Sequence, residues 1–483
     1  MTKIHFTFGV VASTGLNLLQ AANPASPNVV IVQVDEHSFR TIGAYRELLS
    51  KEQAEMWGAG NVVQTPNMDK LAANGVLCTQ VYTNCPQSSP SRASFLTGLY
   101  SQNTDVIVNG ISLNDKVETF AQVMVQNGYS TAYLGKWHLD EKAGLPGWKP
   151  KRNFGFTDNR YMFNNGHWKQ FIETINGPEV ATKNEKGQPT YEVKGATPEN
   201  YATDFLTDRT IDFIQANKKK PFCVMLSLPD PHDPNTVRAP YDEMYQNMKF
   251  KKPRTWKEGE KKQTISDKEL AIYFGMVKCI DDNMGKLMKV LKKTGLDRNT
   301  IIIYTADHGD MLGEHNKDDK GVAYEASMKI PFIIQYPKVL PRGKVVHQVM
   351  STVDFKPTLL KLIGINGKQN DEGSDYSQIL LTGKTPEGFK NIAFCRGPAM
   401  QRNDMFTFIS AVTDRYKLIC SPKGGKPILY DRVKDPDELI NFYDDENYKE
   451  IIQKLLKELS QYGTKFNDKR VNEQSVNNLI TKE

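Results

Sequence analysis

The stretch from Ser88 to Gly98, which reads SSPSRASFLTG, combines residue types that can react with an anion. Pro90 suits the first turn of a helix, where its missing N–H group is not needed. Ser88 then lies just before that turn, where free backbone N–H groups and the helix dipole favour negative charge. Arg92 follows one turn later and can hold an anionic oxygen through two hydrogen bonds. The spacing predicts an anion-reacting loop; an ordinary capped helix start is the alternative.

Two predicted strands end in acidic residues. The apolar run 28–34 is followed by Asp35 and Glu36, and the run 300–306 by Asp307, His308, Gly309 and Asp310. Continuous apolar runs are typical of buried parallel strands, whose carboxyl ends are where α/β proteins bind ligands. Neighbouring carboxylates repel each other unless a cation lies between them, so these ends indicate a hard divalent cation. A solvated acidic turn is the alternative for Asp35 and Glu36 alone.

Basic residues follow two further predicted strands. Lys136 and His138 alternate after the strand 129–134, so both side chains should point at one pocket. His232 lies in a Pro-rich turn after the strand 221–228, where a histidine is suited to general acid catalysis. Lys136 and His138 alone are a weak signal, because a salt-bridged sheet edge is the alternative. For His232 the alternative is a histidine in a surface turn, which would be favoured if the neighbouring motifs were missing.

Together these motifs resemble those of the type I sulfatases of the alkaline phosphatase superfamily. That family carries Cys or Ser, any residue, Pro-Ser-Arg, a spacer and Leu-Thr-Gly, a pattern that residues 88–98 fill. Cys85 also precedes a proline, but Gln87 follows that proline, so Cys85 does not fit. The resemblance extends over nearly the whole chain after the first residues, and its other main matches are Asp35-Glu36, Gly135-Lys136-Trp137-His138, His232, and Asp307-His308-Gly309.

The resemblance implies a cofactor and a set of site residues. Ser88 would be oxidised to formylglycine. The implied metal ligands are Asp35, Glu36, Asp307, His308 and the modified Ser88. Mostly oxygen ligands favour Ca²⁺, with Mg²⁺ or Mn²⁺ as alternatives. Glu36 stands where the family has Asp, which leaves its ligand role open. The implied catalytic residues are Ser88, Arg92, Lys136, His138, His232 and Lys320. Lys317 competes with Lys320 for the last position, and the distance to Tyr324-Glu325 favours Lys320.

The implied mechanism assigns each of these residues a step. The metal and Lys136 would lower the pKa of one hydroxyl of the aldehyde hydrate, Asp307 would accept its proton, and the oxygen would attack sulfur. Arg92, Lys136, His232 and Lys320 would stabilise charge on the sulfate oxygens. The alcohol would leave with a proton from His232 or Lys320. His138 would then take a proton from the second hydroxyl to expel sulfate, a step that an unmodified serine does not allow.

The sequence is less specific about the substrate. Residues 153–168 combine aromatic and amide side chains, which is typical of a sugar-facing loop, and a surface loop held by its own aromatic residues is the alternative. The predicted substrate is sulfated carbohydrate, with glycosaminoglycan-derived oligosaccharides ahead of aryl sulfates. The candidate substrate-binding residues are Lys136, His232, Lys320, Arg238, His167 and Trp168.

Two rival functions are weighed against this one. A phosphatase or phosphodiesterase of the same superfamily would use an unmodified Ser88, and the Pro-Ser-Arg element and the lysines argue against it. A binding protein would have lost site residues, yet all the expected polar positions are filled. A sulfuric ester hydrolase is therefore the predicted class.

A doubly wound α/β fold would position these residues. The 483 residues are long enough for a mostly parallel sheet flanked by helices, similar to that of alkaline phosphatase, and a smaller C-terminal α+β subdomain with a short antiparallel sheet. The predicted boundaries are 1–22 for a signal peptide, 23–370 for the catalytic domain and 371–483 for the subdomain. The periodic apolar residues from 267 onward predict a long helix that covers the sheet.

The first 22 residues and the composition set the expected location and partners. Lys3 precedes the apolar run 6–19 and small residues at 21–22, which predicts a signal peptide and periplasmic export; a leader of a cytoplasmic enzyme is the alternative. The run is too short to span a bilayer. A serine precursor implies a radical-type sulfatase-maturating enzyme as a partner. The net charge of +6, without a basic arm or zinc-finger spacing, argues against nucleic acid.

The remaining expectations concern assembly and cysteines. A monomer or a small homo-oligomer is expected. The six cysteines show no C-x-x-C pair, and their pairing is left open.

Overall fold

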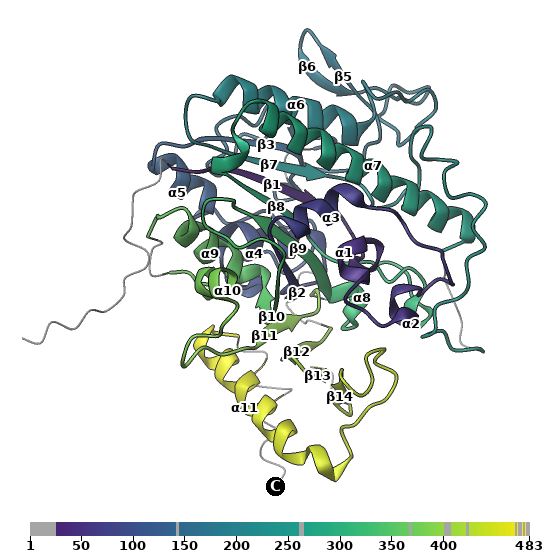
Figure 1. Cartoon of the computed structure of the whole chain (residues 1–483), viewed down its shortest axis with the longest axis vertical. Coiled ribbons are helices and arrows are strands. Elements are labelled where there is room, and N and C mark those ends of the chain that lie inside the picture. The colour runs from purple at the N-terminus through teal and green to yellow at the C-terminus, as the bar shows by residue number, and fades with distance from the viewer. Residues whose placement is uncertain are drawn as a thin grey trace, which may run out of the picture.

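The computed structural model describes residues 26–483 apart from 142–143, 260–264, 367–369, 400–406, 422–424, 469–470, 472–475, 477–478 and 480–483. The predicted signal peptide lies outside the described residues. A large sheet between two layers of helices fills most of the molecule, and a small sheet with one long helix lies at its C-terminal end (Figure 1).

Eight strands form the central sheet in the order β10-β2-β9-β8-β1-β7-β3-β4. Their bounds are Asn28–Val34 (β1), Val76–Tyr82 (β2), Ser130–Lys136 (β3), Met162–Phe163 (β4), Phe222–Leu228 (β7), Thr300–Ala306 (β8), Lys329–Gln335 (β9) and Lys344–Ser351 (β10). Only β9 runs antiparallel to its neighbours in this sheet of the described chain. The predicted mostly parallel sheet is therefore confirmed.

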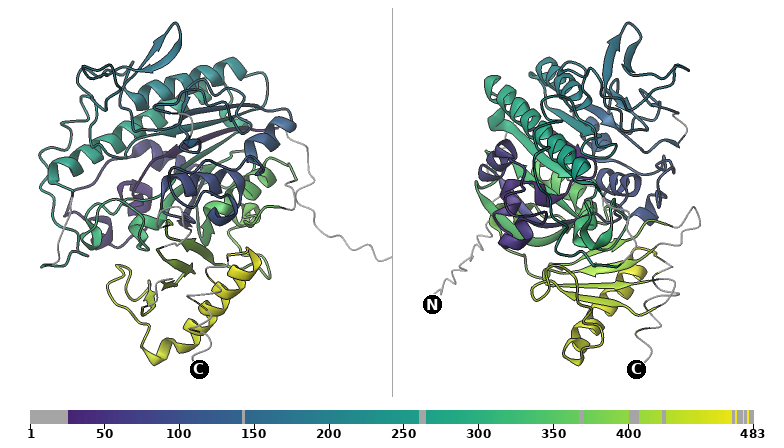
Figure 2. Two further views of the ribbon diagram at one scale, coloured as in Figure 1. Left: turned by 180° about the vertical axis from the view of Figure 1, so that it is seen from behind. Right: turned by 90° about the vertical axis from the view of Figure 1, so that its right-hand side faces the viewer.

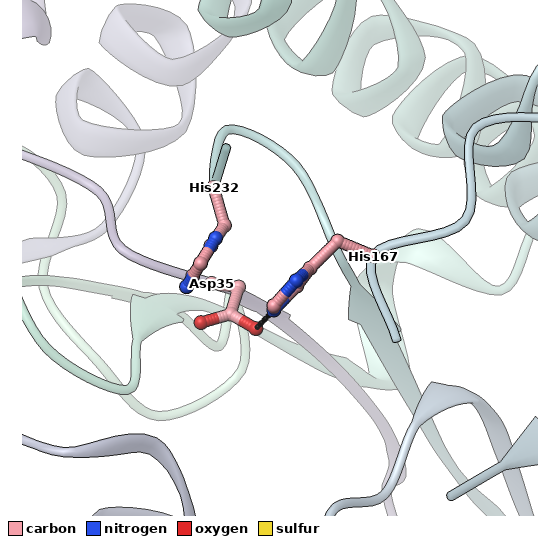
Figure 3. Close-up of side chains that lie close together, drawn as sticks. All are labelled: Asp35, His167 and His232. Atoms are coloured by element: carbon pink, nitrogen blue, oxygen red, sulfur yellow. Dashed lines mark ion pairs between the residues drawn. The ribbon is translucent and has the colours of Figure 1, made fainter. Parts of the chain in front are cut away.

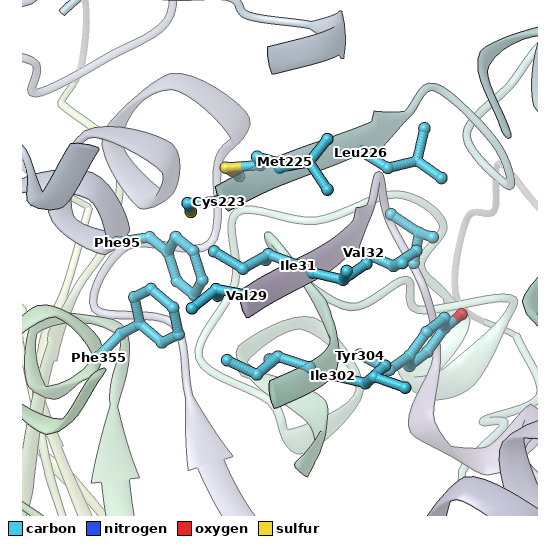
Figure 4. Packing of buried hydrophobic residues seen from close by; sticks show 14 of the residues in the cluster. Val29, Ile31, Val32, Phe95, Cys223, Met225, Leu226, Ile302, Tyr304 and Phe355 are labelled. Atoms are coloured by element: carbon cyan, nitrogen blue, oxygen red, sulfur yellow. The ribbon is translucent and has the colours of Figure 1, made fainter. Parts of the chain in front are cut away.

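The three central strands β1, β7 and β8 are buried along their whole length. Their β-branched and aliphatic side chains pack above and below the sheet, as Figure 4 shows around Ile31. Phe95 and Phe355 stack beside this core with ring centroids 3.7 Å apart. Each large apolar side chain buried in this way contributes about 1.5–3 kcal/mol, so the middle of the sheet is a rigid base for residues at its end.

Helices cover both faces of the sheet (Figures 1 and 2). One face carries α3 (Pro66–Ala73), α6 (Ala202–Asn217) and α7 (Asp267–Lys293), and the other carries α4 (Ser88–Thr97), α5 (Phe120–Gln126) and α9 (Phe355–Leu362). The long predicted helix is α7, which begins with a capping box between Ser266 and Glu269. The short elements are α1 (Gly43–Arg46), α2 (Lys51–Ala54), α8 (Glu325–Met328), α10 (Ser377–Thr382) and the projecting hairpin of β5 (Phe171–Thr174) and β6 (Gly177–Val180).

The C-terminal part is an antiparallel sheet covered by a helix, as predicted. Its strands are β11 (Ala393–Arg396), β12 (Ile409–Val412), β13 (Tyr416–Cys420) and β14 (Ile428–Asp431), and its helix is α11 (Lys449–Lys465). Apolar residues of α11, such as Leu456 and Leu459, pack on Leu418 and Leu429 of the sheet. The exact domain boundary at residue 370 stays a prediction.

Two further properties bear on the expectations from sequence. All six cysteines are buried and carry free thiols. In the part of the chain that the structure describes, no helix has both the length and the apolar character to span a membrane.

Candidate active site

Ser88 is the first residue of α4 and only 1% exposed. All ten residues of this helix are buried, and Pro90 lies in its first turn, as predicted. The helix ends at Gly98, whose φ of 70° lets its N–H donate to the carbonyl of Ser94. The sequence thus places the Ser88 hydroxyl at the positive end of a fixed, buried helix.

The two acidic strand ends meet beside Ser88. Strands β1 and β8 pair in parallel with Val34 opposite Ala306, so Asp35 and Asp307 leave the sheet at the same level. The Ser88 Oγ atom lies 3.1 Å from His308 Nε2 and 3.4 Å from Asp35 Oδ1. Three of the predicted metal ligands and Ser88 are therefore brought together.

Asp35, Asp307 and His308 form a group that can hold a divalent cation. Their ligand atoms all lie within 4.8 Å of one another. The His308 Nδ1 atom lies 2.9 Å from the carbonyl oxygen of Gly309, which can only accept, so Nδ1 carries the proton and Nε2 offers its lone pair. Two buried carboxylates, one imidazole nitrogen and the Ser88 oxygen are suitable donors for Ca²⁺, Mg²⁺ or Mn²⁺.

Glu36 lies apart from that group. Its backbone φ is 62°, and its side chain belongs to a second group with His232 and Asp319. The Oε2 atom of Glu36 lies 2.9 Å from His232 Nε2 and 2.8 Å from Lys320 Nζ. Its Oε1 atom is buried and has no hydrogen-bond partner among the described residues. Glu36 can therefore offer a cation only its Oε1 atom, because its Oε2 atom is bound by His232 and Lys320.

Arg92 holds the acidic strand ends in place. Its Nε and Nη2 atoms both lie 2.9 Å from Asp307 Oδ2, and its Nη1 donates to Ser227 Oγ at 2.6 Å and to the carbonyl of Lys136 at 3.0 Å. Although burial opposes the charged form, Asp307 and Asp35 raise the pKa of Arg92. The guanidinium is thus engaged by protein groups from three strand ends, which makes Arg92 a positioning residue.

Four nitrogen-bearing side chains gather next to Asp35. Lys136 forms an ion pair with Asp35, and its Nζ atom lies 2.6 Å from His167 Nε2. The rings of His167 and His232 stack with centroids 3.6 Å apart, and Asp35 lies against the pair, as Figure 3 shows. Lys320 Nζ lies 2.6 Å from His232 Nε2. This arrangement can bind a tetrahedral anion through several donors at once.

The charge of this cluster depends on the neighbouring acids. Burial alone would lower the pKa of His232, but Glu36 and Asp233 outweigh it and raise the pKa to about 10. Lys320 likewise has a raised pKa because Glu36 and Asp319 outweigh its burial. Both basic groups already contact Glu36, and a tetrahedral anion can accept further hydrogen bonds from them.

His138 has the opposite character. Burial, followed by the charge of Lys136, lowers its pKa well below the usual value, so its imidazole is neutral. Its backbone has a φ of 59° and is fixed by a hydrogen bond from its N–H to Asn164 and one from the Ser89 hydroxyl to its carbonyl. Its buried Nδ1 atom has no hydrogen-bond partner among the described residues. A neutral, unpaired imidazole is suited to accept a proton.

The sequence was compared with models of known protein families. A family model described as Sulfatase matches residues 27–365. The chain belongs to the sulfatase family. A second model, described as N-sulphoglucosamine sulphohydrolase, C-terminal, matches residues 313–465. As a sulfatase, the protein is a sulfuric ester hydrolase, which confirms the predicted class.

Individual relatives cover nearly the whole sulfatase. It is 27% identical to an N-acetylglucosamine-6-O-sulfatase of Bacteroides thetaiotaomicron, over 92% of this chain and 89% of the relative. It is also 27% identical to an endo-4-O-sulfatase of the same species, over 94% and 95%. A solved complex of a protein with its substrate D-glucosamine-2-N,6-O-disulfate has the same fold, with a TM-score of 0.76 at 23% identity over 95% of this chain and 100% of the other.

Two residues predicted to bind the sulfatase substrate have other partners. Arg238 is buried, and its Nε and Nη2 atoms bind Asp204 of α6 at 2.7 and 2.9 Å. Trp168 is 4% exposed, and its indole N–H donates to the carbonyl of Asn165 at 2.7 Å. The structure therefore does not bring the Arg238 guanidinium to the anion-binding cluster, and it leaves Trp168 as a support for other residues.

Sequence reasoning missed some residues that fix the site. Asp233 accepts from His232 Nδ1 at 2.6 Å, and its position next to His232 in the turn was the only signal. Ser227, the second-last residue of the buried strand β7, accepts from Arg92 and donates to the carbonyl of Lys136. Nothing in the apolar pattern of this strand distinguishes a serine with a positioning role from one that packs.

Proposed function

We propose that this sulfatase removes O-sulfate from glycosaminoglycan-derived oligosaccharides by means of a formylglycine formed from Ser88 and a divalent cation. The observation that supports the proposal is the place of Ser88 Oγ, beside Asp35 and His308 at the start of α4. The basic residues Lys136, His167, His232 and Lys320 gather on the other side of Asp35. A nucleophile, a cation site and an anion site thus adjoin one another.

The names of the relatives support the sugar substrate. Both Bacteroides thetaiotaomicron relatives are O-sulfatases, and one of them is named for N-acetylglucosamine. Aryl sulfates are the second candidate substrate, and a phosphatase that uses unmodified Ser88 is the second candidate activity.

The cation would be held by Asp35, Asp307, His308, the oxygen of residue 88 and the free Oε1 of Glu36. When present, the cation and the hydrated aldehyde of residue 88 supply an acidified hydroxyl as the nucleophile toward sulfur. Oxygen ligands in the majority favour Ca²⁺, with Mg²⁺ and Mn²⁺ as alternatives.

The protein residues would perform the remaining steps. Lys136, His167, His232 and Lys320 bind the sulfate oxygens and offset the charge that grows on them. His232, protonated because its pKa is raised to about 10, donates a proton through Nε2 to the leaving sugar oxygen, and Lys320 is the alternative donor. His138, neutral because it is buried, takes a proton from residue 88 when sulfate leaves. Arg92 holds Asp307 and Asp35 in place.

Mass spectrometry of the peptide that contains residue 88 tests the proposal. We expect a loss of about two hydrogens when the protein is produced with a radical-type sulfatase-maturating enzyme, and no loss without it. A panel of sulfated disaccharides and aryl sulfates then identifies the substrate. Turnover of phosphate esters by unmodified protein would favour the phosphatase, and an aldehyde without any turnover would favour a binding protein.

Export to the periplasm and a monomer or small homo-oligomer complete the proposal. The predicted signal peptide supports export, and the two relatives come from a bacterium. N-terminal sequencing of the mature protein, with cleavage expected after residue 22, tests export, and light scattering tests the oligomeric state.

A further inference from the structure

One exposed tyrosine lies two residue contacts from the anion-binding cluster, through Trp168 and its sequence neighbour His167. Tyr191 is 40% exposed, whereas the other large exposed side chains are aliphatic and include Ile175 at the tip of the β5–β6 hairpin. The ring of Tyr191 packs on the ring of Trp168, with centroids 4.6 Å apart and planes tilted by 30°. One face of Tyr191 is thus supported by a buried ring while a large part of its surface remains open.

Trp168 makes this support rigid. Its indole is 4% exposed, and its only polar atom already donates to the carbonyl of Asn165. Its neighbour in sequence, His167, stacks on His232. The aromatic rings therefore lead from the anion-binding cluster through His167 and Trp168 to Tyr191.

Tyr191 also approaches the anion-binding cluster at His167. Burial raises the pKa of Tyr191, although a hydrogen bond with the backbone of His167 lowers it. The ring of His167 in turn stacks on the ring of His232, the proposed proton donor, with centroids 3.6 Å apart. Tyr191 is therefore an exposed ring beside the residues proposed to bind the sulfate.

We propose that Tyr191, supported by Trp168, forms a sugar-binding subsite that stacks on the sugar released by hydrolysis. The inference rests on the proposed sulfatase activity toward sugars. A pyranose ring presents an apolar face of C–H groups, for which a flat, exposed aromatic ring that is already fixed in place is a suitable partner. Fixing the ring in advance also reduces the entropy lost on binding.

Stacking on an unreactive part of the sugar acts equally on the ground state and the transition state. Its loss should therefore raise KM and leave kcat nearly unchanged. This pattern separates Tyr191 from the residues that bind the sulfate, whose loss lowers kcat.

The test compares Tyr191→Ala, Tyr191→Phe and the control Ile175→Ala in the matured enzyme, with N-acetylglucosamine 6-sulfate or the panel sugar that the wild type hydrolyses. We expect KM to rise about three- to tenfold for Tyr191→Ala, with kcat and inhibition by inorganic sulfate unchanged. Tyr191→Phe keeps the ring and should stay within twofold of the wild type, as should Ile175→Ala. A wild-type KM for Tyr191→Ala, or an equal loss of sulfate inhibition, would overturn the subsite.

A measurement without turnover separates this inference from the proposed function. In saturation-transfer NMR with the Ser88→Ala protein and the same sugar sulfate, the C–H protons of the sugar should receive saturation, and the additional Tyr191→Ala change should weaken the transfer. Transfer that is unaffected by Tyr191→Ala contradicts the subsite even if the enzyme is a sugar sulfatase. Absence of hydrolysis by aldehyde-bearing wild type contradicts the proposed function instead. A thermal unfolding midpoint within about 2 °C of wild type confirms that Tyr191→Ala is folded.

Discussion

The Oγ atom of Ser88 lies 3.1 Å from Nε2 of His308, although 220 residues separate the two in sequence. The contact exists because β1 and β8 are parallel neighbours and α4 begins where both strands end. The His308 ring is held by its Nδ1 contact to the carbonyl of Gly309. Backbone pairing therefore fixes both the position of Ser88 and the candidate cation site. A substitution in one should alter the geometry of the other.

Replacing Ser88 with alanine should abolish turnover. The proposed nucleophile is derived from this side chain, so we expect kcat to fall at least about a thousandfold. Ser94→Ala on the same helix is the matched control, because the buried Ser94 hydroxyl has no hydrogen-bond partner in the described chain. Steady-state kinetics should show near wild-type activity for Ser94→Ala, and equal loss in both variants would mean that damage to α4 is responsible.

Removal of divalent cations should lower both activity and stability. A cation that binds only the folded protein stabilises it by about 2.7 kcal/mol at a concentration one hundred times Kd. We expect a chelator to lower the unfolding midpoint, and separate addition of Ca²⁺, Mg²⁺ and Mn²⁺ to show which ion restores it. The Asp35→Asn variant should respond less to the added ion, since Asp35 belongs to the ligand group. An unfolding midpoint that ignores the chelator would contradict the cation site.

Arg92→Ala should destabilise the fold as well as impair catalysis. The substitution leaves the buried Asp307 without its ion-pair partner and removes one of the two cations beside Asp35, a loss that lowers the free energy of unfolding by about 3–5 kcal/mol. Arg298 is exposed at the surface, and Arg298→Ala should change the free energy by less than about 0.5 kcal/mol. Chemical denaturation of both variants provides the measurement.

Arg238→Ala should separate structure from substrate binding. Because Arg238 is bound by Asp204, its loss leaves a buried carboxylate and should lower the free energy of unfolding by about 3 kcal/mol. KM for the sugar sulfate should stay within about twofold of wild type. Lys320→Ala should instead lower kcat/KM by about a hundredfold, since Lys320 lies in the anion-binding cluster. A rise of KM in Arg238→Ala without a loss of stability would show that Arg238 binds the substrate.

Acid should destabilise the protein in part through His37. This histidine is buried between Thr41 and Tyr304, and burial lowers its pKa to about 3. Below pH 6.5 the imidazole of His37 is protonated in the unfolded chain, whereas in the folded chain it stays neutral down to about pH 3. The free energy of unfolding therefore falls as the pH falls from 6.5 to 3. The contribution is at most about 1.4 kcal/mol per pH unit. Denaturation of His37→Gln between pH 4.5 and 6.5 should show a shallower pH dependence; an unchanged slope would refute this role.

The positions at strand ends could be predicted from sequence because apolar runs mark where buried strands stop. Asp35, Asp307 and Lys136 follow such runs directly, and the parallel pairing brings them together. The direction of Glu36 could not be predicted, since it depends on a backbone φ of 62° that no pattern indicates.

Loops were harder to interpret than strand ends. Arg238 has the residue type of a sulfate contact, but its partner Asp204 comes from a helix 34 residues earlier. Trp168 has the type of a sugar contact, but it is covered by Tyr191, which comes from an irregular segment 23 residues later. Which aromatic ring faces solvent depends on tertiary packing, and neither periodicity nor composition reports it.

The burial of α4 bears on when the proposed conversion of Ser88 could occur. Ser88 is 1% exposed and every other residue of its helix is buried, so the folded chain hides this side chain from a second enzyme. The conversion that we propose would therefore have to take place before folding, while residues 88–98 are still an extended peptide. On this proposal, a chain that folds first would keep its serine and stay inactive, and the specific activity of a preparation would depend on whether the chain meets the maturase before it folds.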